Sequence, residues 1–324
     1  MTQTVQAEPT TLGTAAARRR GRPSRKQPRA RTGMNARSNK MAYLMLAPVV
    51  ILLTIFVVWP VVYAVYLSFY NWSFYTDPIP VGWRNYMNVL GDRTFIESVG
   101  RGLLFAVMVV PVQLVIAFLF ASLVRTVSGR VATLLKVSIY IPTIVSGVIA
   151  SIIFVLIYNY QGGILNAFVG LFGVEKQAWL GNVSTALPAL AVPAIWLGLG
   201  ICSLIMLAGM VDIPATYYEA ADLDGANWFQ KTFFVTIPLM KNIFLFLLIT
   251  GFTAAVQQFE LPLVMTDGGP LERTLLPNLY IFQHFRNDTY VGYSIAAAIL
   301  LMVVLGSISA VIFRVLNSEK AVDG

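Results

Sequence analysis

The sequence predicts an all-α, polytopic membrane protein with six transmembrane helices. Of its 324 residues, 57% are hydrophobic and only 12% are charged, whereas a soluble domain carries roughly 25% charged residues. Six long apolar segments follow one another along the chain. Lipid cannot hydrogen-bond a bare backbone, so each segment is expected to be a helix. The short alternating strands typical of a membrane β-barrel are not visible in the sequence.

The lengths of the apolar segments fit a lipid bilayer. A spanning helix needs about 20 apolar residues, because the hydrocarbon core is ~30 Å thick and each residue rises ~1.5 Å. The segments that meet this test are approximately 42–70, 102–124, 134–158, 187–211, 241–265 and 291–314. Between them lie three short outer loops, at roughly 71–96, 159–185 and 266–290. We expect the single cysteine, Cys202, to be a buried packing residue, and the single histidine, His284, to lie in a surface loop.

The basic residues are concentrated at the N-terminus. Residues 1–40 contain ten Lys or Arg and one acid, Glu8, and are predicted to be a disordered arm. If the N-terminus is inside, the inner segments after the arm hold seven Lys or Arg and the outer segments hold six. This difference is too small to set the orientation, so the ten basic residues of the arm decide it. Both termini are therefore expected in the cytoplasm of a cell-membrane protein. The arm is interpreted as an orientation signal with affinity for anionic membrane lipid, and nucleic acid is not expected as a partner.

These features predict three parts: the arm, a transmembrane domain over 41–318, and a short cytoplasmic tail at 319–324. Within the domain, the sequence carries no sign of an enzyme. No glycine is followed by lysine, so a nucleotide-binding P-loop is absent, and His and Cys do not cluster. The chain is therefore expected to bind no cofactor itself. A stand-alone secondary transporter or channel stays open as an alternative, although such carriers more often place charges deep within their spans.

The inner loop at 212–241 is predicted to form a helix–turn–helix that is too polar to span the membrane. Pro214 suits the first position of a helix, because the missing N–H would be unpaired there. Gly225 can adopt the left-handed conformation that ends a helix. Residues 227–234 are then expected to form a second short helix, which Pro238 stops.

Two acids on the first of these helices, Glu219 and Asp222, are three residues apart and repel each other. Apart from Lys231, the loop offers no nearby basic residue to offset them. From the residues alone, two interpretations stay open: a solvated acidic loop, or a docking element that meets Arg or Lys on a partner.

A longer pattern runs through the same loop: Glu219-Ala220-Ala221, three residues, Gly225, nine residues, then Val235-Thr236-Ile237-Pro238. It resembles the EAA loop of the permease subunits of binding-protein-dependent ABC importers. Val235 and Ile237 replace the usual Ile and Leu. Downstream, Met265-Thr266-Asp267-Gly268-Gly269-Pro270 with Thr274 and Tyr290-Val291-Gly292-Tyr293 is similar to the sugar and glycerol-phosphate branch of that family.

This resemblance spans residues 42–316 and implies how the protein works. It implies import of a sugar, such as a di- or oligosaccharide, with the loop at 212–238 acting as a coupling helix. The implied partners are a second homologous permease, two ATPase subunits that bind ATP and Mg, and an extracytoplasmic solute-binding protein. The implied coupling residues are Glu219, Ala220, Ala221, Asp222, Gly225 and Pro238.

A candidate substrate pathway lies on the fifth segment. Polar groups are rare in a span and need hydrogen-bond partners. Sugar hydroxyls would provide such partners for Gln257, Gln258 and Glu260, and Phe259 would pack against a sugar ring. Trp196, between a proline and a glycine of the fourth segment, is a further candidate. The alternative is that these polar groups bond to one another across helices within the bundle.

Overall fold

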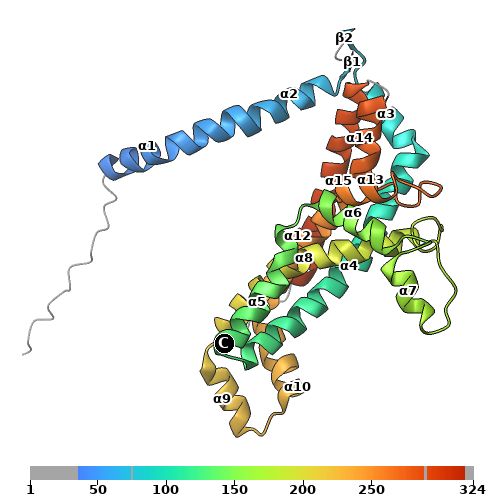
Figure 1. Cartoon of the computed structure of the whole chain (residues 1–324). Coiled ribbons are helices and arrows are strands. Elements are labelled where there is room, and N and C mark those ends of the chain that lie inside the picture. The colour runs from blue at the N-terminus through green and yellow to red at the C-terminus, as the bar shows by residue number, and fades with distance from the viewer. Residues whose placement is uncertain (1–35, 74–75, 288–289, 318–324) are drawn as a thin grey trace, which may run out of the picture. The chain divides into compact units, whose positions relative to one another are not determined.

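The computed structural model describes residues 36–73, 76–287 and 290–317, and these residues are mainly helical (Figure 1). The chain divides into two units, residues 1–57 and 58–324. The first contains helix α1 (Ala36–Leu53), which leads into the π-helical turn η1 (Thr54–Val58). The prediction that 1–40 is disordered is wrong for its last five residues, because these are helical and belong to α1. The rest of the arm, and the tail at 319–324, lie outside the described residues.

The second unit is a helical bundle with one small two-stranded sheet. Its elements are α2 (Trp59–Leu67), β1 (Tyr70–Ser73), β2 (Thr76–Pro80), α3 (Arg84–Gly91), α4 (Arg93–Thr126), α5 (Gly129–Ile144), α6 (Gly147–Ile157), α7 (Ile164–Gly170), α8 (Ala186–Val211), α9 (Ala215–Leu223), α10 (Trp228–Lys231), η2 (Thr232–Thr236), α11 (Ile237–Leu239), α12 (Lys241–Val256), α13 (Glu260–Met265), α14 (Pro277–Asn287) and α15 (Val291–Asn317). Strands β1 and β2 are antiparallel, with Tyr70 opposite Pro80.

Five helical stretches in the described part of the chain are long and apolar enough to cross a membrane. They are Tyr43–Leu67, Arg93–Thr126, Ala186–Val211, Lys241–Met265 and Val291–Leu316, and each contains or overlaps a predicted segment. The third predicted segment, 134–158, is instead divided between α5 and α6, whose axes are bent by 97°. The total is six if this bent pair is one span. The expectation of a single continuous helix over 134–158 is therefore wrong.

The break between α5 and α6 has a local cause. Val145 is extended, with φ −74° and ψ 132°, and Ser146 then caps a new helix by accepting a hydrogen bond from the backbone N–H of Ile149 at 3.3 Å. The next residue, Gly147, lies so close to Glu260 that a Cβ there would overlap the carboxylate. The bend therefore brings the start of α6 against the start of α13.

The centre of the bundle is the packing of α4 against α8 and α12. Phe105 and Val109 of α4, Leu190 of α8 and Val256 of α12 are buried together in one apolar cluster. Cys202 is buried in α8, as predicted. The outward faces of the same helices stay apolar: Val107 of α4, for example, is 60% exposed. An apolar outer surface of this kind suits contact with lipid.

The predicted outer loops contain more regular structure than expected. The first outer loop contains strands β1 and β2 and helix α3, the second contains α7, and the third contains α14. His284 lies in the last turn of α14 and not in a loop, so that prediction is wrong. Its ring packs 4.1 Å from the ring of Tyr280, which is fully buried one turn earlier. Burial of that apolar face favours helix over loop for this segment.

Asp92, directly before α4, connects α4 with α14 and α15. Its Oδ1 caps the helix by accepting hydrogen bonds from the N–H groups of Thr94 (2.7 Å) and Phe95 (3.4 Å). Its Oδ2 accepts from the hydroxyls of Tyr280 (2.5 Å) on α14 and Tyr293 (3.1 Å) on α15. Partial burial acts to raise the pKa of Asp92, but these four hydrogen bonds outweigh it and the net pKa is lowered. Burial, with the Asp92 contact, raises the pKa of Tyr280.

The lowered pKa of Asp92 predicts an acid-sensitive contact. A carboxyl whose folded-state pKa is depressed contributes stability above its unfolded pKa, about 3.9, and loses that contribution as pH falls through the folded pKa. We expect Asp92→Asn to lower stability at pH 7 by about 1–2 kcal/mol, because it removes the charge from the two tyrosine bonds. Between pH 5 and pH 3 the variant should then lose less thermal stability than the wild type in detergent. Parallel losses in the two proteins would contradict this assignment.

Candidate functional site

Helices α9 and α10 form an elbow, defined here as residues 212–236, at one end of the bundle (Figure 1). The turn between them is at Gly225, which has φ +72° and so adopts the predicted left-handed conformation. Its N–H donates to the carbonyl of Asp222 at 3.0 Å, and the N–H of Ala226 donates to that of Ala221 at 2.9 Å. These two bonds close the C-terminus of α9.

Two details of the elbow differ from prediction. Pro214 is the residue before α9, which begins at Ala215, so it caps the helix instead of occupying its first position. Pro238 does not stop the second helix, because the chain stays helical from α10 through η2 into α11. Pro238 lies at the start of α11, directly after the π-helical turn. Proline has no N–H to donate to the preceding helical turn, and that turn is the π-helical segment η2.

The acids of the elbow are not equivalent. Asp222 pairs with the ammonium of Lys231, so it holds α9 to α10 within the chain. Glu219 is exposed and forms no ion pair with any described residue. Leu223, one turn further along α9, is 91% exposed. The outward face of α9 therefore presents an uncompensated carboxylate and an apolar side chain.

Tyr218 connects the elbow to the bundle. Its hydroxyl lies 3.0 Å from the hydroxyl of Thr236 in η2. The guanidinium of Arg125, in the last turn of α4, lies over the Tyr218 ring at 4.2 Å from its centroid. Tyr218 thus links α9 both to η2 and to α4, the longest helix of the bundle.

A cavity of ≈ 500 Å³ lies within the bundle. The predicted pathway residues Gln257, Gln258, Phe259 and Glu260 line it together, because α12 ends before them and α13 begins at Glu260. The side chains of the two glutamines and of Glu260 form no hydrogen bond with any described residue. These polar groups therefore face the cavity without internal partners.

The cavity also contains a polar residue that the sequence analysis missed. Gln113, in the middle of α4, lines the cavity beside Gly198 of α8. The available signal was its position as a lone amide within a charge-free apolar stretch. Trp196 lies outside the lining, and its ring packs edge-on against Phe154 at 5.8 Å.

A bundle of spanning helices with a polar cavity and a projecting elbow is the architecture of the membrane subunit of a transporter. Residues 86–321 match the family described as the binding-protein-dependent transport system inner membrane component, and the chain belongs to that family. The matched region includes both the elbow and the cavity. The protein is therefore a multi-pass permease subunit of an ABC importer.

Characterised relatives extend over most of the chain. The sulfoquinovosyl glycerol transport system permease SmoG of Agrobacterium fabrum is 31% identical and covers 86% of this chain and 91% of its own. The trehalose/maltose transport system permease MalF of Thermococcus litoralis is 30% identical, over 86% of this chain and 94% of its own length. The osmoprotective compounds uptake permease GgtC of Synechocystis is 31% identical, over 84% of this chain and 98% of its own length.

Solved structures share the fold. A subunit of a bacterial ABC transporter that imports the acidic polysaccharide alginate superposes with a TM-score of 0.75 at 19% identity, covering 88% of this chain and 98% of its own. A second structure, of the alginate transporter with an alginate pentasaccharide-bound periplasmic protein, gives a TM-score of 0.75 at 20% identity over the same shares.

Proposed function

We propose that this permease carries a sugar, of the di- or oligosaccharide class, into the cytoplasm, driven by ATP that separate ATPase subunits bind and hydrolyse. The observation that carries the proposal is the elbow, whose exposed Glu219 has no partner among the described residues. The sugar class is supported by relatives whose names refer to trehalose/maltose and arabinooligosaccharides. ATP and Mg belong to the partners, since this chain has no P-loop.

The proposed assembly contains a second homologous permease, two ATPase subunits and an external solute-binding protein. A periplasmic binding protein is present in the solved alginate transporter complex, which supports the last of these. We propose that the elbow and both termini lie in the cytoplasm. Arg125 lies beside the elbow and Lys231 lies within it, and this agrees with the preference of basic residues for the inner face.

The proposed coupling runs from the elbow to the cavity. A basic groove on an ATPase subunit binds α9, with Glu219 paired to an Arg or Lys of that subunit. When the two ATPases close on ATP, α9 moves, and the Tyr218–Arg125 contact passes this movement to α4. Helix α4 carries Gln113, so the cavity changes its shape and access. Differential ATPase binding thereby biases the bundle between two states.

The cavity is proposed as the substrate pathway, where Gln113, Gln258 and Glu260 bond to sugar hydroxyls and Phe259 packs on the ring. We expect Gln113→Leu and Gln258→Leu each to lower ATP-dependent uptake about tenfold, because each removes a hydrogen-bonding partner from bound sugar. Uptake of labelled maltose, trehalose and related disaccharides by proteoliposomes containing the full transporter measures this effect.

The matched control is Gln161→Leu, which changes the same residue type in an exposed turn outside the cavity. Its uptake should equal that of the wild type. If both cavity variants also transport like the wild type, the pathway lies elsewhere. Uptake that persists in full without ATP would instead favour a stand-alone carrier or channel.

A further inference from the structure

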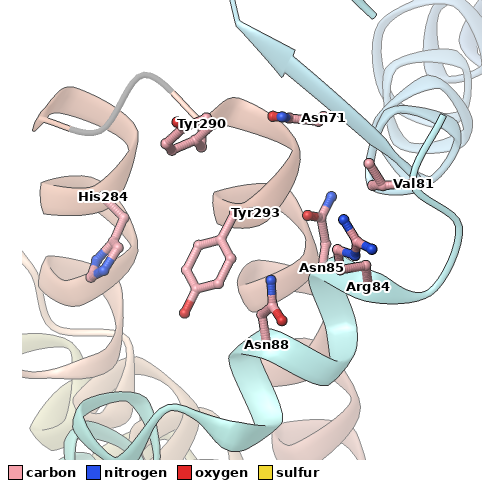
Figure 2. A pocket seen from close by; sticks show the side chains of 8 residues that line it. All are labelled: Asn71, Val81, Arg84, Asn85, Asn88, His284, Tyr290 and Tyr293. Carbon is pink, nitrogen blue, oxygen red and sulfur yellow. The ribbon is translucent and has the colours of Figure 1, made fainter. Parts of the chain in front are cut away.

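A second cavity, of ≈ 340 Å³, lies at the end of the bundle opposite the elbow. In Figure 1 this is the end that carries β1, β2 and α3. We call it the outer pocket. Its lining, shown in Figure 2, consists of Asn71, Val81, Arg84, Asn85, Asn88, His284, Tyr290 and Tyr293. It shares no residue with the cavity at the α12–α13 break.

On the α3 side of the outer pocket, the amide and guanidinium groups have few partners within the described residues. Asn85 is fixed because its Nδ2 donates to the carbonyls of Ser68 (2.8 Å) and Tyr70 (3.1 Å), and its Oδ1 accepts from no described group. The side-chain amide of Asn88 and the guanidinium of Arg84 likewise form no hydrogen bond or ion pair with any described residue. The pocket thus offers both donors and acceptors.

The opposite wall is aromatic and held in place. Tyr293 is fixed by its hydroxyl, which bonds to Asp92 at 3.1 Å and lies 2.8 Å from the hydroxyl of Tyr280. His284 lies beside it, with ring centroids 5.4 Å apart, and its Nδ1 lies 3.0 Å from the carbonyl oxygen of Tyr280. Tyr290 adds a second phenol at the rim, so the pocket has two phenol rings and an imidazole (Figure 2).

We propose that the outer pocket binds a single glycosyl unit and prefers one that carries an acidic group. Paired amides match the donor and acceptor pattern of neighbouring hydroxyls, and the tyrosine faces suit the apolar face of a pyranose ring. Arg84 provides a charge-assisted bond to a carboxylate. The described residues of the lining include no Asp or Glu, so an amino sugar gains no matching bond from them. This ligand class rests on the proposed sugar import, with the pocket acting as an entry site.

Direct binding, measured without ATP, tests the outer pocket separately from transport. The probes are p-nitrophenyl glucuronide, glucoside and glucosaminide, added to the assembled transporter in nanodiscs and followed by ligand-observed NMR. We expect the glucuronide to bind about three- to fivefold more tightly than the glucoside, as for a partly exposed ion pair, and the glucosaminide to bind most weakly. Arg84→Gln should remove the preference for the glucuronide, and Asn88→Ala should weaken all three.

The matched control is Arg93→Gln, because Arg93 is 91% exposed, pairs with Glu97 and lies outside the pocket. It should bind the probes like the wild type. Unchanged binding in both Arg84→Gln and Asn88→Ala would overturn the proposal, as would equal affinity for all three probes. If binding follows the expected order but ATP-driven sugar uptake is absent, the proposed function fails while the outer pocket stands.

Discussion

Replacing Gly225 with valine is expected to lower ATP-driven uptake at least tenfold while the transmembrane bundle still folds. Gly225 has φ +72°, a conformation that a β-branched residue strongly disfavours. A Cβ at this position would meet no atom within 4 Å, so the penalty comes only from the backbone. Valine should therefore open the turn and release the bond from Ala226 to Ala221. The outward face of α9 would then no longer meet the ATPase at the required angle.

Gly225→Asn is the matched control, because asparagine tolerates the left-handed region much better than valine. It should keep most of the uptake and most of the stimulation of ATP hydrolysis by the loaded binding protein. Both readouts are measured on the reconstituted transporter, with thermal unfolding as a check on the bundle. Valine and asparagine variants of equal activity would show that the turn conformation is not required.

Gly292→Ala is expected to have the largest effect on folding. Gly292 is the second residue of α15, and a Cβ there would overlap the backbone oxygen of Tyr70 and lie 3.2 Å from that of Leu67. Backbone atoms cannot rotate away, so α15 must separate from the chain at β1. Overpacking of this kind costs about 1–3 kcal/mol or more. We expect a lower unfolding temperature and less protein in the membrane.

The control for this substitution is on the same helix. A Cβ at Gly306 of α15 would meet nothing within 4 Å, and alanine favours helix over glycine by about 1 kcal/mol. Gly306→Ala should therefore be neutral or slightly stabilising by the same unfolding measurement. Equal destabilisation by the two variants would show that general helix effects, and not the approach to Tyr70, are responsible.

The sequence predicted the parts of the fold that depend on local signals. Long apolar runs identify spanning helices because the bilayer requires them, and the turn at Gly225 follows from a single residue type. The break at Ser146 was missed because residues 137–158 are mainly apolar and carry no charge. Hydropathy records only whether a segment is buried in lipid, and it does not report a cap that starts a new helix.

Contacts between distant residues were beyond the sequence. The polar residues at the α12–α13 break could be predicted as a group because they are adjacent, whereas Gln113 joins them only through the packing of α4. The outer pocket depends on Asn85 bonding to Tyr70 and on Tyr293 reaching Asp92. The Asp222–Lys231 pair is a contact of the same kind, because it joins α9 to α10 and was not predicted from the sequence.

Site-directed photo-crosslinking tests most directly whether an ATPase subunit binds this permease at the elbow. Glu219 is replaced by p-benzoylphenylalanine in the assembled transporter, and exposed Glu175, in the segment after α7, is replaced in the same way as the control. The expected result is a crosslink from position 219 to the ATPase subunit and none from position 175. An ATPase crosslink from position 175, or none from position 219 in a transporter that remains active, would contradict the proposed coupling.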